Sequence, residues 1–135
     1  LGREYVAEAG LSDRISYVDG SALETDWPAA QDAILMSYLF SGVPGKEHAD
    51  LVERAYETLA TGGLYMVHDF VVDADRTGPK LAALWQLQHT AFTPTARSLD
   101  EATLADMMTG AGFEAVEVGE MIPGLTMLAT GRKPG

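Results

Sequence analysis

Long apolar runs along the chain indicate where strands lie. Residues 31–40 read QDAILMSYLF, a nearly continuous apolar run that is typical of a strand covered on both faces. Residues 64–72, LYMVHDFVV, predict a second such strand, and residues 14–20, RISYVDG, predict a short one. The last run, residues 113–133, predicts two strands joined by a turn at Pro123-Gly124.

Helical spacing separates these runs. Residues 45–63, GKEHADLVERAYETLATGG, place apolar side chains on one face, and we expect Gly62-Gly63 to end this helix. Residues 78–92, GPKLAALWQLQHTAF, predict a helix with Pro79 near its first turn. A short stretch at residues 3–10, REYVAEAG, is typical of the last turns of a helix.

A third full helix is predicted over residues 98–113, SLDEATLADMMTGAGF. Ser98 is the expected N-cap, and Glu101 follows three residues later, which is the spacing of a capping box. Strands and helices thus alternate before a closing hairpin. This order predicts one α/β domain with a largely parallel sheet and a C-terminal antiparallel hairpin.

Composition and charge narrow the function. The 135 residues are 47% hydrophobic, and 9 Lys and Arg stand against 20 Asp and Glu, giving a net charge of -11. Such a charge repels phosphate backbones and argues against binding to nucleic acid or to an anionic membrane. A small molecule or a protein is the expected partner. The absence of cysteine excludes thiolate metal ligands, and no metal site is predicted.

Neither a bilayer-spanning apolar run nor a basic-then-apolar leader is visible in the sequence. We therefore expect a cytoplasmic protein.

The order of several segments resembles a known family. These segments are AGLSDRISYVDGSALETDWP, DAILMSYLF, LVERAYETLATGGLYMVHDFV, SLDEATLADMMTGAGFEAVEV and LTMLATGRKP. Together they resemble the C-terminal part of the S-adenosylmethionine-dependent methyltransferase domain of small-molecule O-methyltransferases. The resemblance implies that residues 1–135 form the C-terminal portion of a Rossmann-like catalytic domain. The first two strands, the Gly-rich cofactor loop and the N-terminal dimerisation domain are not among them.

The resemblance implies a cofactor side formed by two short segments. One is Asp19, Gly20, Ser21 and Ala22, which match the family's adenine contact, although Ser21 replaces its acid. The other is Ser37 and Tyr38 at the end of residues 31–40, where open α/β sheets bind ligands. The alternative is that Asp19-Gly20 is only a turn and that Tyr38 is a core aromatic.

The family's usual general base is missing. Ser41, Gly42 and Val43 stand where many members have a His-Asp-Trp segment, and an unassisted serine is too weak a base to replace the histidine. The family's second acid is also lost, since Ala96 to Ser98 leave only Arg97 in its segment. His48 lies on the helix at residues 45–63 and is expected to face solvent.

Asp69 and His89 are the remaining catalytic candidates. Strand alternation sends His68 and Asp69 to opposite faces, and the resemblance gives the cleft to Asp69, leaving His68 partly buried and structural. His89 lies on the helix that lines the acceptor pocket in the family. Substrate contacts would come from Trp85, Gln88 and Phe92. In the alternative, Trp85 and Phe92 are ordinary core residues and His89 is a core histidine.

The leading hypothesis is a methyltransferase that uses S-adenosylmethionine and acts on a flat secondary metabolite or pigment. Its O- or C-methylation would proceed by proximity and orientation. The resemblance also implies a homodimer in the full-length protein. Two alternatives are a relative repurposed for another reaction, such as hydroxylation, and a non-catalytic fragment that only dimerises.

Overall fold

The elements follow one another in the order that the sequence predicts, with one strand fewer. The computed structural model describes residues 1–135. Its helices and strands are α1 (Gly2–Glu8), β1 (Gln31–Ser37), α2 (His48–Thr58), β2 (Leu59–Asp69), α3 (Lys80–Phe92), α4 (Glu101–Gly110), β3 (Glu114–Ile122) and β4 (Thr126–Arg132). Two 3₁₀ turns, η1 (Phe40–Gly42) and η2 (Gly45–Glu47), connect β1 to α2.

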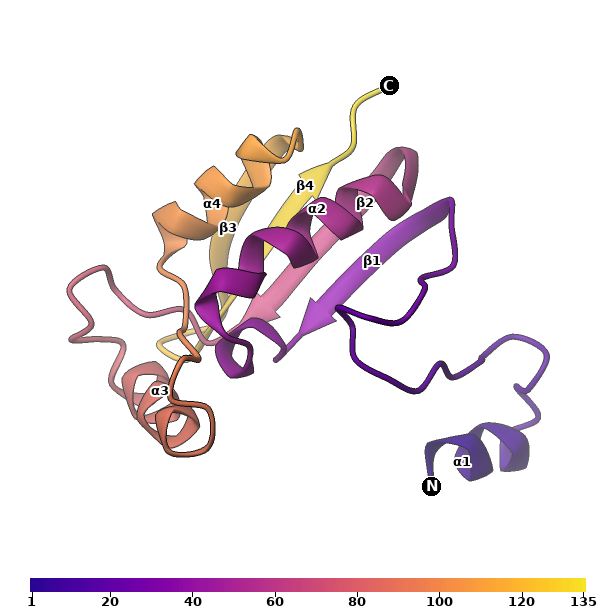
Figure 1. Ribbon diagram of the computed structural model, residues 1–135, viewed down its shortest axis with the longest axis horizontal. Helices are drawn as coiled ribbons and strands as arrows, with labels where there is room; N and C mark the ends of the chain where they lie inside the picture. The colour runs from indigo at the N-terminus through magenta and orange to yellow at the C-terminus, as the bar shows by residue number, and fades with distance from the viewer.

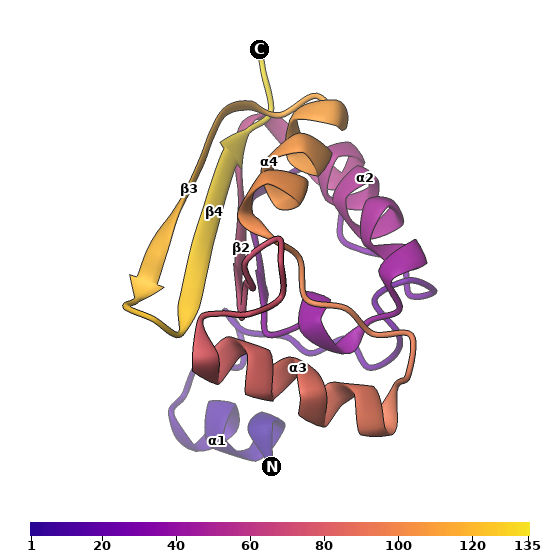
Figure 2. The same cartoon turned by 90° about the vertical axis from the view of Figure 1, so that its left-hand side faces the viewer.

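The four strands form one mixed sheet in the order β1-β2-β4-β3 (Figure 1). β1 and β2 are parallel, whereas β4 is antiparallel to both of its neighbours. The α/β fold and the closing hairpin are thereby confirmed. Because β1 and β2 are parallel, their carboxyl ends, Ser37 and Asp69, lie at the same edge of the sheet, and α3 crosses below this edge (Figures 1 and 2).

Helices α2 and α4 cover one face of the sheet (Figure 2). Their apolar stripes and the inward-facing strand residues form a single main core. Tyr65 of β2 stacks on Phe113, with ring centroids 5.0 Å apart, and its hydroxyl donates to Met36 Sδ of β1. The buried side chains of the main core are Met36, Phe40, Leu51, Val52, Ala55, Leu59, Tyr65, Val67, Val71, Leu99, Leu104, Met108, Phe113 and Ala129.

The other face of the sheet carries no helix of this chain (Figure 2). Leu35 of β1 points to this face and is 56% exposed, and its register partner Met66 is half-buried. The prediction that residues 31–40 form a strand covered on both faces is therefore wrong for β1. An apolar run shows that a strand could be buried on both faces, but it does not show that both faces are covered. Here helices pack against only one face of β1.

Residues 14–20 do not form the predicted strand. Ile15, Tyr17 and Val18 are exposed, and β1 pairs only with β2. A strand needs a neighbour to satisfy its backbone N–H and C=O groups, and residues 14–20 have none. The segment that follows is held from α2, because the Arg54 guanidinium donates to the carbonyls of Leu23 and Thr25 and lies over the Trp27 ring.

Two predicted helix ends are also corrected. α2 ends at Thr58, and the Gly62-Gly63 pair lies inside β2 rather than in a helix cap, because Leu59 turns into extended backbone and is buried in the core. α4 is capped by Asp100 and not by Ser98, since the Asp100 carboxylate accepts a hydrogen bond from the Thr103 N–H at 2.8 Å. None of the helices has the length and apolar character needed to cross a bilayer.

Candidate active site

Asp69 lies at the carboxyl end of β2 and is almost completely buried. Its Oδ2 accepts a hydrogen bond from the backbone N–H of Ser41 at 3.1 Å, and its Oδ1 accepts one from the Phe70 N–H at 2.7 Å. Hydrogen bonds to an ionised acceptor are stronger than neutral ones. The carboxylate therefore holds η1 against the end of β2.

Ser41 connects this carboxylate to α3. The Trp85 Nε1–H donates to Ser41 Oγ at 3.3 Å, and the Trp85 ring stacks on Phe70 with centroids 4.4 Å apart. His89, one turn further along α3, meets the Trp85 ring edge-on at 5.2 Å, as their predicted shared face requires. Gly42 makes room for this imidazole, because a Cβ at that position would lie 3.3 Å from His89 Cε1.

The structure thus joins Asp69 to His89 through Ser41 and Trp85, and not by a direct hydrogen bond. No hydrogen bond holds the half-buried His89 ring, so both of its nitrogens remain available. Gln88 and Phe92 are not part of this group. Both are exposed on α3, Phe92 by 81%.

Ser37 and Tyr38 follow at the end of β1, beside the same group. Ser37 Oγ lies 3.1 Å from His68 Nδ1, and His68 Nε2 lies 3.0 Å from Thr126 Oγ1. This half-buried histidine faces away from Asp69, as the strand alternation predicts. Tyr38 has left-handed backbone at φ 53°, and its ring packs on both His68 and Phe70, with centroids 4.8 and 5.3 Å away.

The segment predicted to contact adenine, residues 19–22, lies at the surface, and only Ala22 is half-buried. Asp19 is exposed and its Oδ2 accepts a hydrogen bond from Arg3 Nη2 at 2.6 Å, while Ser21 Oγ accepts one from the Leu23 N–H at 3.2 Å. Ala22, together with Ser37, lines a cavity of about 500 Å³ that extends along β1. The structure therefore brings Ala22 and Ser37 to one cavity and leaves Asp19, Gly20, Ser21 and Tyr38 outside its lining.

Comparison with known proteins identifies the family. A family model described as an O-methyltransferase domain matches residues 2–114. The chain belongs to this family.

Relatives of this O-methyltransferase domain have named activities. The chain is 28% identical over 114 residues to an L-tyrosine C(3)-methyltransferase of Streptomyces lavendulae, which covers 84% of the chain and 31% of the relative. It is 26% identical over 116 residues to a 3-hydroxy-5-methyl-1-naphthoate 3-O-methyltransferase of Streptomyces sahachiroi, covering 86% of the chain and 33% of the relative. The chain thus spans about a third of the length of these curated relatives.

Solved structures agree on the fold. The S-adenosylmethionine-dependent methyltransferase SibL, in its apo form, superposes with a TM-score of 0.80 at 25% identity. The match covers 98% of the chain and 40% of SibL.

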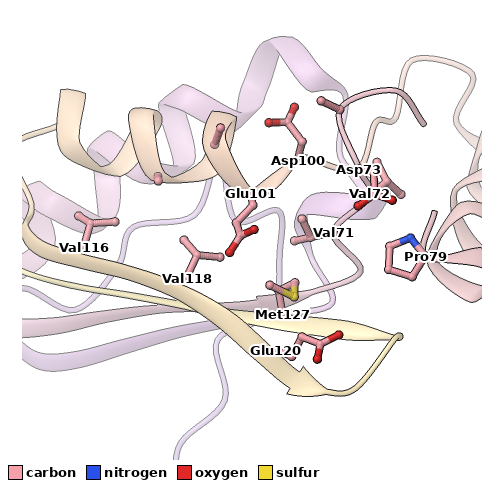
Figure 3. Close-up of a pocket in the computed structure, with 13 residues that line it drawn as sticks. Val71, Val72, Asp73, Pro79, Asp100, Glu101, Val116, Val118, Glu120 and Met127 are labelled. Atoms are coloured by element: carbon pink, nitrogen blue, oxygen red, sulfur yellow. The ribbon is translucent and has the colours of Figure 1, made fainter. Parts of the chain in front are cut away.

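Another cavity in this O-methyltransferase domain lies away from the predicted site residues. It measures about 670 Å³ and opens between α4, the β3-β4 hairpin and the segment after β2 (Figure 3). Valines and Met127 form its apolar floor, and the carboxylates of Asp73, Asp100, Glu101 and Glu120 surround it. None of the residues predicted for cofactor, acceptor or catalysis lines it.

Sequence reasoning missed two contributors and misplaced a third. Phe70 was not singled out, although an aromatic directly after a strand-ending acid is a usable signal for a ring at the sheet edge. Thr126 was also missed, because nothing local pairs it with His68, 58 residues away. His48 does not face solvent: it is buried at the start of α2, where its Nε2–H donates to the Phe40 carbonyl at 2.9 Å.

Proposed function

We propose that residues 1–135 form the C-terminal portion of the catalytic domain of an S-adenosylmethionine-dependent methyltransferase, and that the whole protein methylates a flat aromatic small molecule. The observation that carries this proposal is the connected group Asp69, Ser41, Trp85 and His89. It lies at the carboxyl ends of two parallel strands, which is where open α/β sheets bind their ligands.

The residues present fit one part of a cofactor site. The cavity along β1 has a volume in the range of small-molecule sites, and apolar side chains line most of it, with the polar groups of Ser37 and Gln31 among them. Ser37, Tyr38 and Ala22 would hold the cofactor at the end of β1, with Asp19, Gly20 and Ser21 nearby. When bound, S-adenosylmethionine supplies an electrophilic methyl group. SibL, whose fold this chain shares, is named as dependent on it.

The acceptor side is aromatic. The exposed ring of Tyr38 and the half-buried ring of Trp85 offer faces on which a conjugated acceptor can stack, and Phe70 is buried against both of them. The two relatives described above are named for tyrosine and for a naphthoate, both aromatic acceptors. Gln88 and Phe92, exposed on the next stripe of α3, would contact the far side of such a ring.

His89 is the residue of this chain best placed to accept a proton from the acceptor. Its ring is free of hydrogen bonds and lies against Gly42, in the segment where the family carries its base. Asp69 acts as a positioning residue, because both of its oxygens fix backbone N–H groups that set η1 and Phe70 in place. The group therefore orients the acceptor and leaves one base available to it.

The test is methyl transfer by the full-length protein, followed as S-adenosylhomocysteine produced with a phenolic aromatic acceptor. We expect His89→Ala to lower kcat about a hundredfold or more, the usual contribution of a general base, with the fold intact by circular dichroism. Leu87→Ala is the matched control, since Leu87 is exposed on the same helix. Equal turnover in both variants would remove His89 from the mechanism.

We also propose that the full-length protein is a cytoplasmic homodimer in secondary metabolism. The resemblance to O-methyltransferases that dimerise through an N-terminal helical domain supports the dimer. The naphthoate acceptor in the name of one relative supports the metabolic role. Light scattering on the full-length protein tests the dimer, and a monomer at micromolar concentration would exclude it.

A further inference from the structure

A third cavity, whose lining includes none of the residues of the proposed active site, is lined by several positive charges. It measures about 540 Å³ and lies between the start of α2, the start of α4 and residues 95–99. Lys46, Arg76 and Arg97 all line it. These are three of only nine Lys and Arg in a chain whose net charge is -11. This cavity is therefore lined mainly by positive charges, whereas the chain as a whole is strongly negative.

None of these three cations forms an ion pair, although the charge of Arg76 acts on the nearby Asp100 carboxylate. The ion pairs of the chain are Leu1 with Glu4 and Arg3 with Asp19, both remote from this cavity. Arg76 uses one N–H to donate to the Ser98 carbonyl, which leaves most of its guanidinium donors free. All three side chains are exposed, and cations that line one hollow raise the positive potential there and so attract an anion.

Ser98 supplies an independent sign of a ligand. It is 1% exposed and lines the cavity, yet its Oγ is the single buried side-chain polar atom without a hydrogen-bond partner. Its backbone is fully engaged, because the N–H donates to Gln86 Oε1 and the carbonyl accepts from Arg76. A buried hydroxyl without a partner is costly, and such a group requires an explanation.

The other polar groups that line the cavity indicate which kind of ligand it could bind. Thr95 and Thr103 also line the cavity, and α2 begins there at His48 without a side-chain cap, so the positive end of its dipole lies close. Asp100 is the one acid in the lining, but its carboxylate already accepts from the N–H and the hydroxyl of Thr103. Hydroxyl, guanidinium and ammonium donors together are the set that binds oxyanions.

We propose that this cavity binds a small oxyanion, phosphate or carboxylate, through the Ser98 hydroxyl and the charges of Lys46, Arg76 and Arg97. The anion would be a free ion or the charged group of a small ligand. The site is separate from the residues to which methyl transfer is assigned, and the proposal does not depend on that assignment.

The experiment measures the melting temperature of the protein in inorganic phosphate, in acetate and in chloride at equal ionic strength. A ligand that binds only the folded state raises the melting temperature. We expect a rise in phosphate or in acetate over chloride, and the stronger of the two identifies the chemistry of the ligand. Equal melting temperatures in all three salts would overturn the proposal.

Variants then locate the binding. Arg97→Gln should weaken the anion about tenfold, the loss of one charge-assisted hydrogen bond, whereas Arg14→Gln, an exposed cation outside the cavity, should leave affinity unchanged. Equal losses in both variants would show non-specific attraction and refute the site.

Ser98→Ala separates ligand binding from folding. Removing an unpaired buried hydroxyl should keep or raise the melting temperature in chloride, while the rise caused by the anion should shrink. An unchanged rise would exclude Ser98 from the site and with it the proposal.

Discussion

At the scale of single residues, His48 shows how a buried imidazole can serve structure alone. Its Nε2–H donates to the carbonyls of Phe40 and Val43, at 2.9 and 3.2 Å, and its ring packs on that of Phe40. It thereby ties the start of α2 to η1, which carries Ser41. Burial lowers the pKa of His48 below its usual 6.5, and the two backbone hydrogen bonds and the charges of Asp69 and Glu47 oppose this only in part.

This depressed pKa predicts a loss of stability in acid. The unfolded chain protonates His48 near pH 6.5, whereas the folded chain does so only at lower pH, so the unfolded state binds more protons between these values. The contribution of His48 is therefore complete above about pH 6.5 and falls as the pH drops toward the pKa of the folded state. Urea unfolding at pH 7.5 and 5.5 measures it.

The matched variant is His48→Gln. Because glutamine cannot be protonated, we expect its free energy of unfolding to be lower by about 1–3 kcal/mol at pH 7.5 but to change less on acidification. The same pH dependence in the variant and in the wild type would assign the acid sensitivity to other groups.

At the scale of elements, the first part of β2 depends on two glycines, each for a different physical reason. Gly62 has φ +77°, a left-handed conformation that other residues adopt at a cost. Gly63 has no such angle, but a Cβ there would lie 2.8 Å from the Ala60 carbonyl oxygen. The first position is limited by backbone conformation and the second by space.

Both glycines should therefore resist alanine. We expect Gly62→Ala to lower the free energy of unfolding by about 1–2 kcal/mol and Gly63→Ala by at least as much. Gly119→Ala in β3 is the control, because nothing lies within 4 Å of a Cβ there. Chemical denaturation of the three variants ranks them, and a loss at Gly119 equal to that at Gly63 would contradict this explanation.

The same part of β2 shows what the sequence could and could not predict. Local patterns were enough for β1, α3, α4 and the closing hairpin, because apolar spacing and turn residues report them directly. They failed at Gly62-Gly63 and at Ser98, where contacts with residues distant in sequence determine where the helix ends or begins. Leu59 leaves the helix because it pairs with Gln31 in the neighbouring strand, and Ser98 is removed from the cap by Gln86 and Arg76.

The candidate site likewise has features that the sequence predicts and features that it does not. The shared helical face of Trp85 and His89 follows from their spacing of four, and the opposite directions of His68 and Asp69 follow from strand alternation. The link from Trp85 to Ser41 joins residues 44 apart and leaves no local signal. Tertiary packing alone could reveal it.

At the scale of the whole molecule, the bare face of the sheet is the main asymmetry. β1 is an edge strand with one hydrogen-bonded neighbour, and its exposed Leu35 lies beside the half-buried Met66. Unpaired strand edges with apolar side chains promote association between chains. We therefore expect the 135-residue chain to self-associate at high concentration.

A charge at this edge should oppose that association. Leu35→Lys is expected to shift the sedimentation profile toward monomer, since edge lysines block strand pairing. Leu87→Lys adds the same charge on α3, away from the sheet, and serves as control. If both variants dissociate the chain equally, net charge and not the strand edge is responsible.

The position of β4 has a consequence for how the chain is made. This strand is the last in sequence but lies between β2 and β3, and its register joins Leu64 to Arg132, 68 residues later. During synthesis on the ribosome, β3 has no strand to pair with until Thr126–Arg132 has left the exit tunnel. Such long-range pairing is slow to form. β2 and β3 therefore keep unpaired edges until β4 has emerged from the ribosome, and a chaperone would bind the nascent chain during this interval.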